Sequence, residues 1–161
     1  MSSFKVVPIP HHIAKEIRAK LVDDQGHRLQ ATPAGQGVGP CRSCLKKFVP
    51  TDRRILFSYS PNAADNPYNE IGPLFIHENE CVPYNGFDRF PLEIKNDKKN
   101  FPLTLRCYNK DKRMSHAEMV GERGVDEVIQ NLFVNKDIEF IHARNAEYGC
   151  FIAKIERANA T

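Results

Sequence analysis

Residues 140–156 read FIHARNAEYGCFIAKIE, in which two apolar segments flank five residues that include Gly149. A loop of about five residues with a glycine is typical of an antiparallel hairpin, so we expect strand, loop and strand here. Side chains alternate between the two faces of a strand, which places His142 and Arg144 on the same face as Phe140. An imidazole and a guanidinium therefore emerge together beside a turn, and this turn is the first candidate for a functional site.

Periodic patterns predict the other elements. Apolar residues recur every four positions from residue 11 to 22, and an apolar stripe at helical spacing runs from Val125 to Phe133, so both segments are predicted helices. Strands are expected at residues 4–9 (an edge strand), 54–60, 74–78, 102–108 and 114–120, whereas residues 82–99 are expected to be irregular.

The short strands and hairpin-type links predict an α+β fold. We expect a mostly antiparallel sheet, formed by the strands near residues 54, 74, 103, 140 and 150 and covered by the two helices. A doubly wound parallel sheet would need repeated alternation of strand and helix, which this chain lacks. Because no linker interrupts the chain, residues 1–161 are expected to form a single globular domain.

Composition narrows the class of protein. Hydrophobic residues make up 41% and charged residues 27%, which is ordinary for a folded soluble domain. The 23 basic and 20 acidic residues give a net charge of +3 without a dense basic stripe, so nucleic acid is not expected as a partner. No apolar segment is long enough for a signal peptide or a membrane span. A cytoplasmic location is the expectation.

The five cysteines are an odd number in a chain large enough to fold without disulfides, which favours a reducing compartment. Cys41 and Cys44 lie two residues apart, a spacing that suits either zinc binding or a redox pair. A closed zinc site needs a second pair of ligands, and Cys81, Cys107 and Cys150 stand singly along the sequence. We therefore expect no structural metal and no cofactor.

Three separated motifs resemble a bacterial family known as domain of unknown function 1203. They are Pro40-Cys41-Arg42 after a Gly/Pro loop, Pro67-Tyr68 followed by Gly72-Pro73-Leu74-Phe75-Ile76-His77, and His142-Ala143 with Asn145 and Gly149-Cys150 before the last strand. The similarity covers residues 40–157, and Cys44 lies outside the family pattern, which argues further against zinc. The resemblance implies no activity, cofactor or catalytic residue.

Two functions fit these residues. The first is a pocket for a small anionic molecule, catalytic or not, built from Arg42, His77, His142, Arg144 and Asn145, with the thiols of Cys41 and Cys150 nearby. Arg binds carboxylates and phosphates, His transfers protons near neutral pH, and a thiolate is a nucleophile. Two guanidiniums in one cavity need a counter-charge, either a ligand or an acidic side chain such as Glu78.

The second function is a non-catalytic protein-interaction module or a homodimerising domain, in which the hairpin and the strand around Phe75 present an apolar face. The candidate site residues also have a purely structural interpretation. Free Cys is commonly buried as a small hydrophobe, and a His or Arg at a strand end often bonds a loop carbonyl. The sequence leaves open whether the chain is an enzyme.

Overall fold

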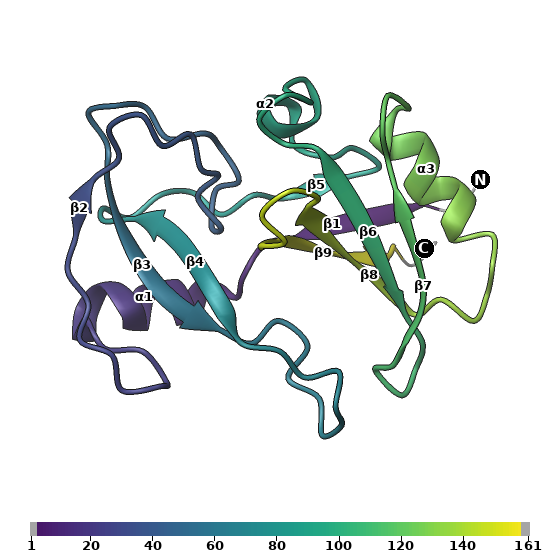
Figure 1. The fold of residues 1–161 in the computed structure, drawn as a ribbon, viewed down its shortest axis with the longest axis horizontal. Helices are drawn as coiled ribbons and strands as arrows, with labels where there is room; N and C mark the ends of the chain where they lie inside the picture. Colours follow the sequence, from purple (N-terminus) through teal and green to yellow (C-terminus); the bar gives the residue numbers. More distant parts are fainter. Residues whose placement is uncertain (1–2, 159–161) are drawn as a thin grey trace.

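The computed structural model describes residues 3–158 and contains two antiparallel sheets (Figure 1). In chain order the elements are β1 (Phe4–Val7), α1 (His11–Lys20), β2 (Thr32–Pro33), β3 (Arg53–Tyr59), β4 (Gly72–His77), β5 (Gly86–Phe87), α2 (Leu92–Lys95), β6 (Leu103–Tyr108), β7 (Met114–Met119), α3 (Val125–Leu132), β8 (Phe140–Asn145) and β9 (Phe151–Arg157). The α+β class expected from the sequence is confirmed.

The expectation of one sheet is wrong. A six-stranded sheet has the order β5-β1-β9-β8-β6-β7, while β3 and β4 pair with each other and with β2 in a separate three-stranded sheet. Hydrophobic periodicity predicts that a segment is a strand but does not name the strand it pairs with. Strand β1 also lies between β5 and β9 and not at the edge, because Pro8 and Pro10 follow the strand instead of interrupting its ladder.

Each of the two predicted helices packs on a different sheet. Helix α3 buries Val128 and Ile129 in the same cluster as Ile141 of β8, which belongs to the larger sheet. Helix α1 buries Ile17 in a second cluster that includes Phe57 of the smaller sheet. The single turn of α2 was missed, since one turn is too short to show helical periodicity. Among the described residues, no helix has the length and apolarity needed to cross a bilayer.

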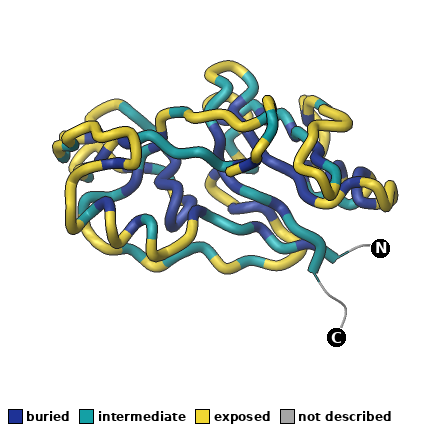
Figure 2. Tube along the Cα trace, turned by 90° about the horizontal axis from the view of Figure 1, so that it is seen from below, coloured by how far each residue is buried: buried dark blue, intermediate teal, exposed yellow. Residues whose placement is uncertain are grey.

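The predicted hairpin is confirmed, with β8 and β9 paired and residues 146–150 between them. Asn145 closes the loop, because its Oδ1 accepts bonds from the backbone N–H groups of Glu147 and Tyr148 at 2.9 and 3.0 Å. Every residue of β8 is buried, and buried segments run through the centre of the molecule while exposed ones follow its loops (Figure 2). Strand β8 is therefore covered on both faces.

On one of these faces His142 is enclosed by aromatic rings. Its ring centroid lies 4.8 Å from that of Tyr108, 5.2 Å from Phe140 and 5.0 Å from Phe151. The side chain has no exposed surface, and neither ring nitrogen bonds to any described residue. Burial lowers the pKa of His142 to about 3, and the nearby charges of Arg144, Lys154 and Arg106 act in the same direction. The imidazole is a neutral core group.

A second buried polar group, Asp23, ties the turn after α1 to β3. Its Oδ1 accepts from the backbone N–H groups of Gln25 and His27, and its Oδ2 accepts from the backbone N–H of Ser58 and contacts His27 Nδ1, all at 2.9–3.0 Å. Burial raises the pKa of Asp23, but these bonds outweigh it and hold that pKa well below its ordinary value. The carboxylate thus stabilises this corner in its charged form.

We expect the folded protein to become less stable as the pH is lowered, because His142 must stay neutral in the folded protein. Its folded pKa lies below the ordinary value of 6.5, so the unfolded chain binds the extra proton and stability is lost as pH falls from about 6.5 towards 3. The slope should be about 1.4 kcal/mol per pH unit. Urea unfolding between pH 6.5 and 4.5 measures the free energy of unfolding at each pH. This free energy should depend less on pH in His142→Phe than in wild type, whereas His12→Phe, at an exposed position, should match wild type. Equal slopes in all three proteins would contradict the prediction.

Replacing Asp23 by Asn should destabilise the protein by about 1–3 kcal/mol, because an amide nitrogen would face the Ser58 N–H and leave a buried donor unpaired. The folded pKa of Asp23 is depressed, so its contribution is complete above about pH 4 and lost at lower pH. Denaturant unfolding at pH 7 measures the effect. Asp24→Asn, at the adjacent exposed position, is the control and should match wild type.

Candidate functional site

Arg42 lies at the junction between the two sheets. It belongs to a tight turn in which the Leu45 N–H donates to the Cys41 carbonyl at 2.8 Å, and its own N–H donates to the Phe75 carbonyl at 3.0 Å. The guanidinium is buried, and it donates from Nε to the Phe151 carbonyl at 2.8 Å and from Nη1 to the Pro40 carbonyl at 2.6 Å. Backbone and side chain together fix this charge between β4 and the hairpin.

A second guanidinium, that of Arg54 on β3, lies nearby. It stacks over the ring of Phe75 at 3.8 Å and lies 5.4 Å from the ring of Phe48. Its Nε is buried and has no hydrogen-bond partner among the described residues. The loop that contains Gly35, Gly37 and Gly39 covers it closely: a Cβ at Gly37 would lie 2.5 Å from an Arg54 Nη atom, so a larger residue there would displace the guanidinium from this position.

Arg42 and Arg54 line one cavity of about 450 Å³, which lies between the Gly/Pro loop, β4 and the hairpin loop. Its lining residues are Gln36, Gly37, Val38, Gly39, Pro40, Arg42, Arg54, Phe75, Asn100, Asn145, Tyr148, Cys150 and Ile152. None of these is acidic. Burial lowers the pKa of Arg42 to about 10; the nearby thiols of Cys150 and Cys41 act in the opposite direction, and the charge of Arg54 acts in the same direction as burial. No carboxylate in the lining of this cavity therefore balances its positive charge.

The structure brings three of the predicted residues, Arg42, Asn145 and Cys150, to this cavity. Asn145 has little capacity left for a ligand, because its Oδ1 holds the hairpin loop and its Nδ2 donates to the Asn100 carbonyl at 3.2 Å. His142, enclosed by aromatic rings, lines neither this cavity nor the neighbouring one. The five predicted residues do not meet in a single pocket.

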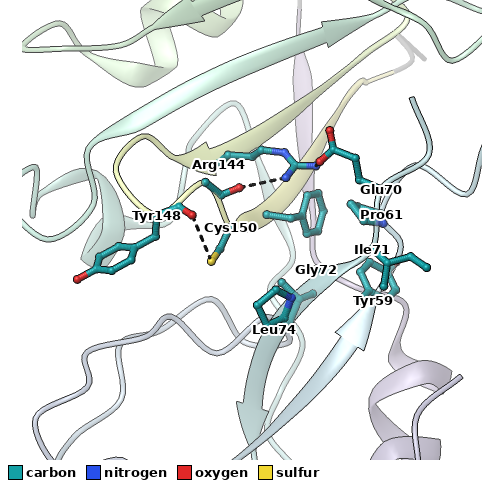
Figure 3. A pocket seen from close by; sticks show the side chains of 12 residues that line it. Tyr59, Pro61, Glu70, Ile71, Gly72, Leu74, Arg144, Tyr148 and Cys150 are labelled. Atoms are coloured by element: carbon teal, nitrogen blue, oxygen red, sulfur yellow. Dashed lines mark hydrogen bonds and ion pairs between the residues drawn. The ribbon is translucent and has the colours of Figure 1, made fainter. Parts of the chain in front are cut away.

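Arg144 lines a smaller neighbouring cavity of about 150 Å³ (Figure 3). Its Nη2 lies 3.3 Å from Glu70 Oε2, and its Nη1 donates to the Gly149 carbonyl at 3.0 Å. Glu70, from the loop before β4, is thus the acidic partner of Arg144, whereas Glu78, the example that the sequence suggests beside a ligand, pairs with Arg53 at 2.7 Å. Arg144 is therefore ion-paired, with a carboxylate that it shares with Arg106, whose Nη1 lies 3.1 Å from Glu70 Oε1.

Arg54 is not among the site residues that the sequence predicts. Arg53 pairs with Glu78, whereas Arg54, at the next position of the same strand, lines the cavity. Alternation along β3 was the available clue, since adjacent residues of a strand face opposite sides. The pattern could not indicate that the Gly/Pro loop would cover one of those sides.

His77 lies apart from both cavities, in a cluster with Cys41, Cys44 and Cys81 whose ligand atoms are all within 4.8 Å of one another. The expectation that Cys41 and Cys44 lack a second ligand pair is therefore wrong. Hydrogen bonds from the thiols of Cys44 and Cys81 hold the pKa of Cys41 well below its ordinary value. Cys41 in turn raises the pKa of His77 to about 9.

Comparison with known families supports the resemblance seen in the sequence. The model of the family described as "Protein of unknown function (DUF1203)" matches residues 38–157, a span that contains Arg42, Arg54, the cysteine cluster and the hairpin. No curated protein and no solved structure matches significantly. Since the matched segment covers most of the chain, this protein belongs to the DUF1203 family.

Proposed function

We propose that this protein binds a small carboxylate- or phosphate-bearing molecule in the cavity between Arg42 and Arg54. One observation carries the proposal: two guanidiniums line one cavity, and neither forms an ion pair with a carboxylate of the described residues. Guanidinium forks match the geometry of carboxylate and phosphate oxygens. The ligand class therefore follows from the donors.

The energetics favour the same conclusion. Burying a charge without a partner is costly, and a second like charge nearby increases that cost. The lowered pKa values of both guanidiniums reflect this burial, and for Arg42 also the repulsion from Arg54. An anion between them would offset both effects at once. Arg42 still has the geometry to bind it, because its two carbonyl bonds use Nε and Nη1 and leave Nη2 available.

The cavity also has a suitable size and wall. A volume of about 450 Å³ falls within the usual range for small-molecule sites, roughly 300–1,000 Å³. Phe75, Val38 and Ile152 give it apolar surface, while Gln36 and Asn100 are polar residues of its lining. The arrangement suits a small organic anion better than a bare inorganic ion, because apolar walls stabilise a carbon skeleton.

Thermal unfolding in the presence of a panel of carboxylates and phosphates tests the proposal. A ligand at a hundred times its Kd should stabilise the folded protein by about 2.7 kcal/mol, a rise of roughly 5–10 °C in Tm. Arg54→Gln should abolish this rise with little change in the Tm of the free protein, because the lost stacking on Phe75 is offset by the removal of a charge that Arg42 repels. Arg53→Gln, one position away and paired with Glu78, is the matched control and should keep the full response.

Arg144→Ala separates the two cavities. It removes the pair with Glu70 and the bond to the Gly149 carbonyl, so the Tm of the free protein should fall while the anion-induced rise persists. A rise lost in Arg144→Ala but kept in Arg54→Gln would place the ligand in the smaller cavity instead. If no anion shifts the Tm of wild type, the interaction-module or homodimer alternative gains, and the molecular mass in solution would then distinguish monomer from dimer.

A further inference from the structure

A second site lies on the other side of the turn that carries Arg42. We propose that Cys41, Cys44, His77 and Cys81 bind one zinc ion in a closed tetrahedral site. Cys41 and Cys44 come from the loop before β3, His77 is the last residue of β4, and Cys81 lies in the loop that follows. Three thiolates and an imidazole are a ligand set that zinc favours for structural sites.

Two distances within the cluster match those of a tetrahedral zinc site. With Zn–S near 2.3 Å and Zn–N near 2.0 Å, tetrahedral angles place two sulfur ligands about 3.8 Å apart and a sulfur and a nitrogen about 3.5 Å apart. The Sγ atoms of Cys41 and Cys81 are 3.8 Å apart, and Cys44 Sγ is 3.6 Å from His77 Nδ1. All four ligand atoms lie within 4.8 Å of one another, whereas a disulfide would require only two of them.

The groups around the cluster support the ligands. His77 Nε2 lies 3.1 Å from Asp52 Oδ2, a contact that turns Nδ1 of the ring towards the sulfurs, as outer carboxylates do for metal-bound histidines. The backbone N–H of His77 donates to Cys41 Sγ at 3.4 Å, and Arg18 donates from Nη2 to Cys81 Sγ at 3.4 Å. These donors stabilise thiolate charge, and Arg18 balances the net negative charge of three thiolates around a divalent ion.

The position of the cluster explains what the ion would do. The smaller sheet has two full strands, β3 and β4, and a third of only two residues, and it is flanked by the irregular segments 34–52 and 78–85. Small assemblies with long loops gain much of their stability from cross-links. Four protein ligands leave no open position for substrate, so the role is structural. The ion would fasten both loops to the end of β4.

Metal analysis of protein purified without chelators, in a phosphine reductant, tests the inference directly. Wild type should contain about one zinc per chain. Cobalt exchanged into the site should give the intense visible absorption of tetrahedral cobalt with thiolate ligands. Cys81→Ser should lose the metal, while Cys150→Ser, which alters a thiol outside the cluster, should retain it.

A variant that keeps four ligands distinguishes loss of a ligand from a general failure to fold. His77→Cys should still bind one ion, with a cobalt spectrum shifted by the fourth thiolate. Removal of zinc by a chelator should lower the Tm of wild type, and added zinc should restore it. Wild type with only trace zinc and no cobalt uptake, or equal metal in Cys81→Ser and wild type, would overturn the inference. A Cys41–Cys81 disulfide found by peptide mass spectrometry in metal-free protein purified without reductant would replace it with a redox pair.

Discussion

The buried charge of Arg42 is the constraint on which the junction between the two sheets depends. Its guanidinium donates to the carbonyl groups of Pro40 and Phe151, which joins the loop before β3 to the hairpin of the larger sheet. Carbonyl oxygens satisfy hydrogen bonds but carry only partial charge, so they offset only part of the cost of burying a cation. The cavity that Arg42 shares with Arg54 is where this remaining charge meets solvent, and the anion proposal rests on that imbalance.

The turn that carries Arg42 places functional side chains on two of its sides. Arg42 itself projects towards the hairpin, while the residues on either side of the turn, Cys41 and Cys44, project towards His77 and Cys81. A ligand clamp works best when neighbouring groups lock its position, and the bond from the Arg42 N–H to the Phe75 carbonyl already does part of this. The proposed zinc ion would fix the same turn from the opposite side. The two proposals are nonetheless separate, because metal content and anion response are measured independently.

The hairpin shows how far local reasoning reaches. Alternation correctly placed His142 and Arg144 on one face of β8, and the five-residue loop correctly predicted the pairing with β9. What covers that face comes from elsewhere in the chain. Tyr108 of β6 and Phe151 of β9 enclose His142, and Glu70, 74 positions before Arg144 in the sequence, pairs with the guanidinium. Residues that looked like a site from their spacing are therefore a core group and a paired charge.

The sequence by itself determined the α+β class, the positions of α1, α3 and the hairpin, and the family, because these depend on periodicity and short motifs within contiguous segments. Only the tertiary structure decided that β3 and β4 form their own sheet and that Arg54 joins Arg42 in one cavity. The contact between Cys41 and His77, 36 positions apart, was likewise decided only by the tertiary structure. The antiparallel pairing of β3 and β4 sets these contacts, since it returns the chain to the loop that carries the cysteines. The spacing of residues along the chain does not predict such long-range contacts, because they depend on how strands pair and loops pack.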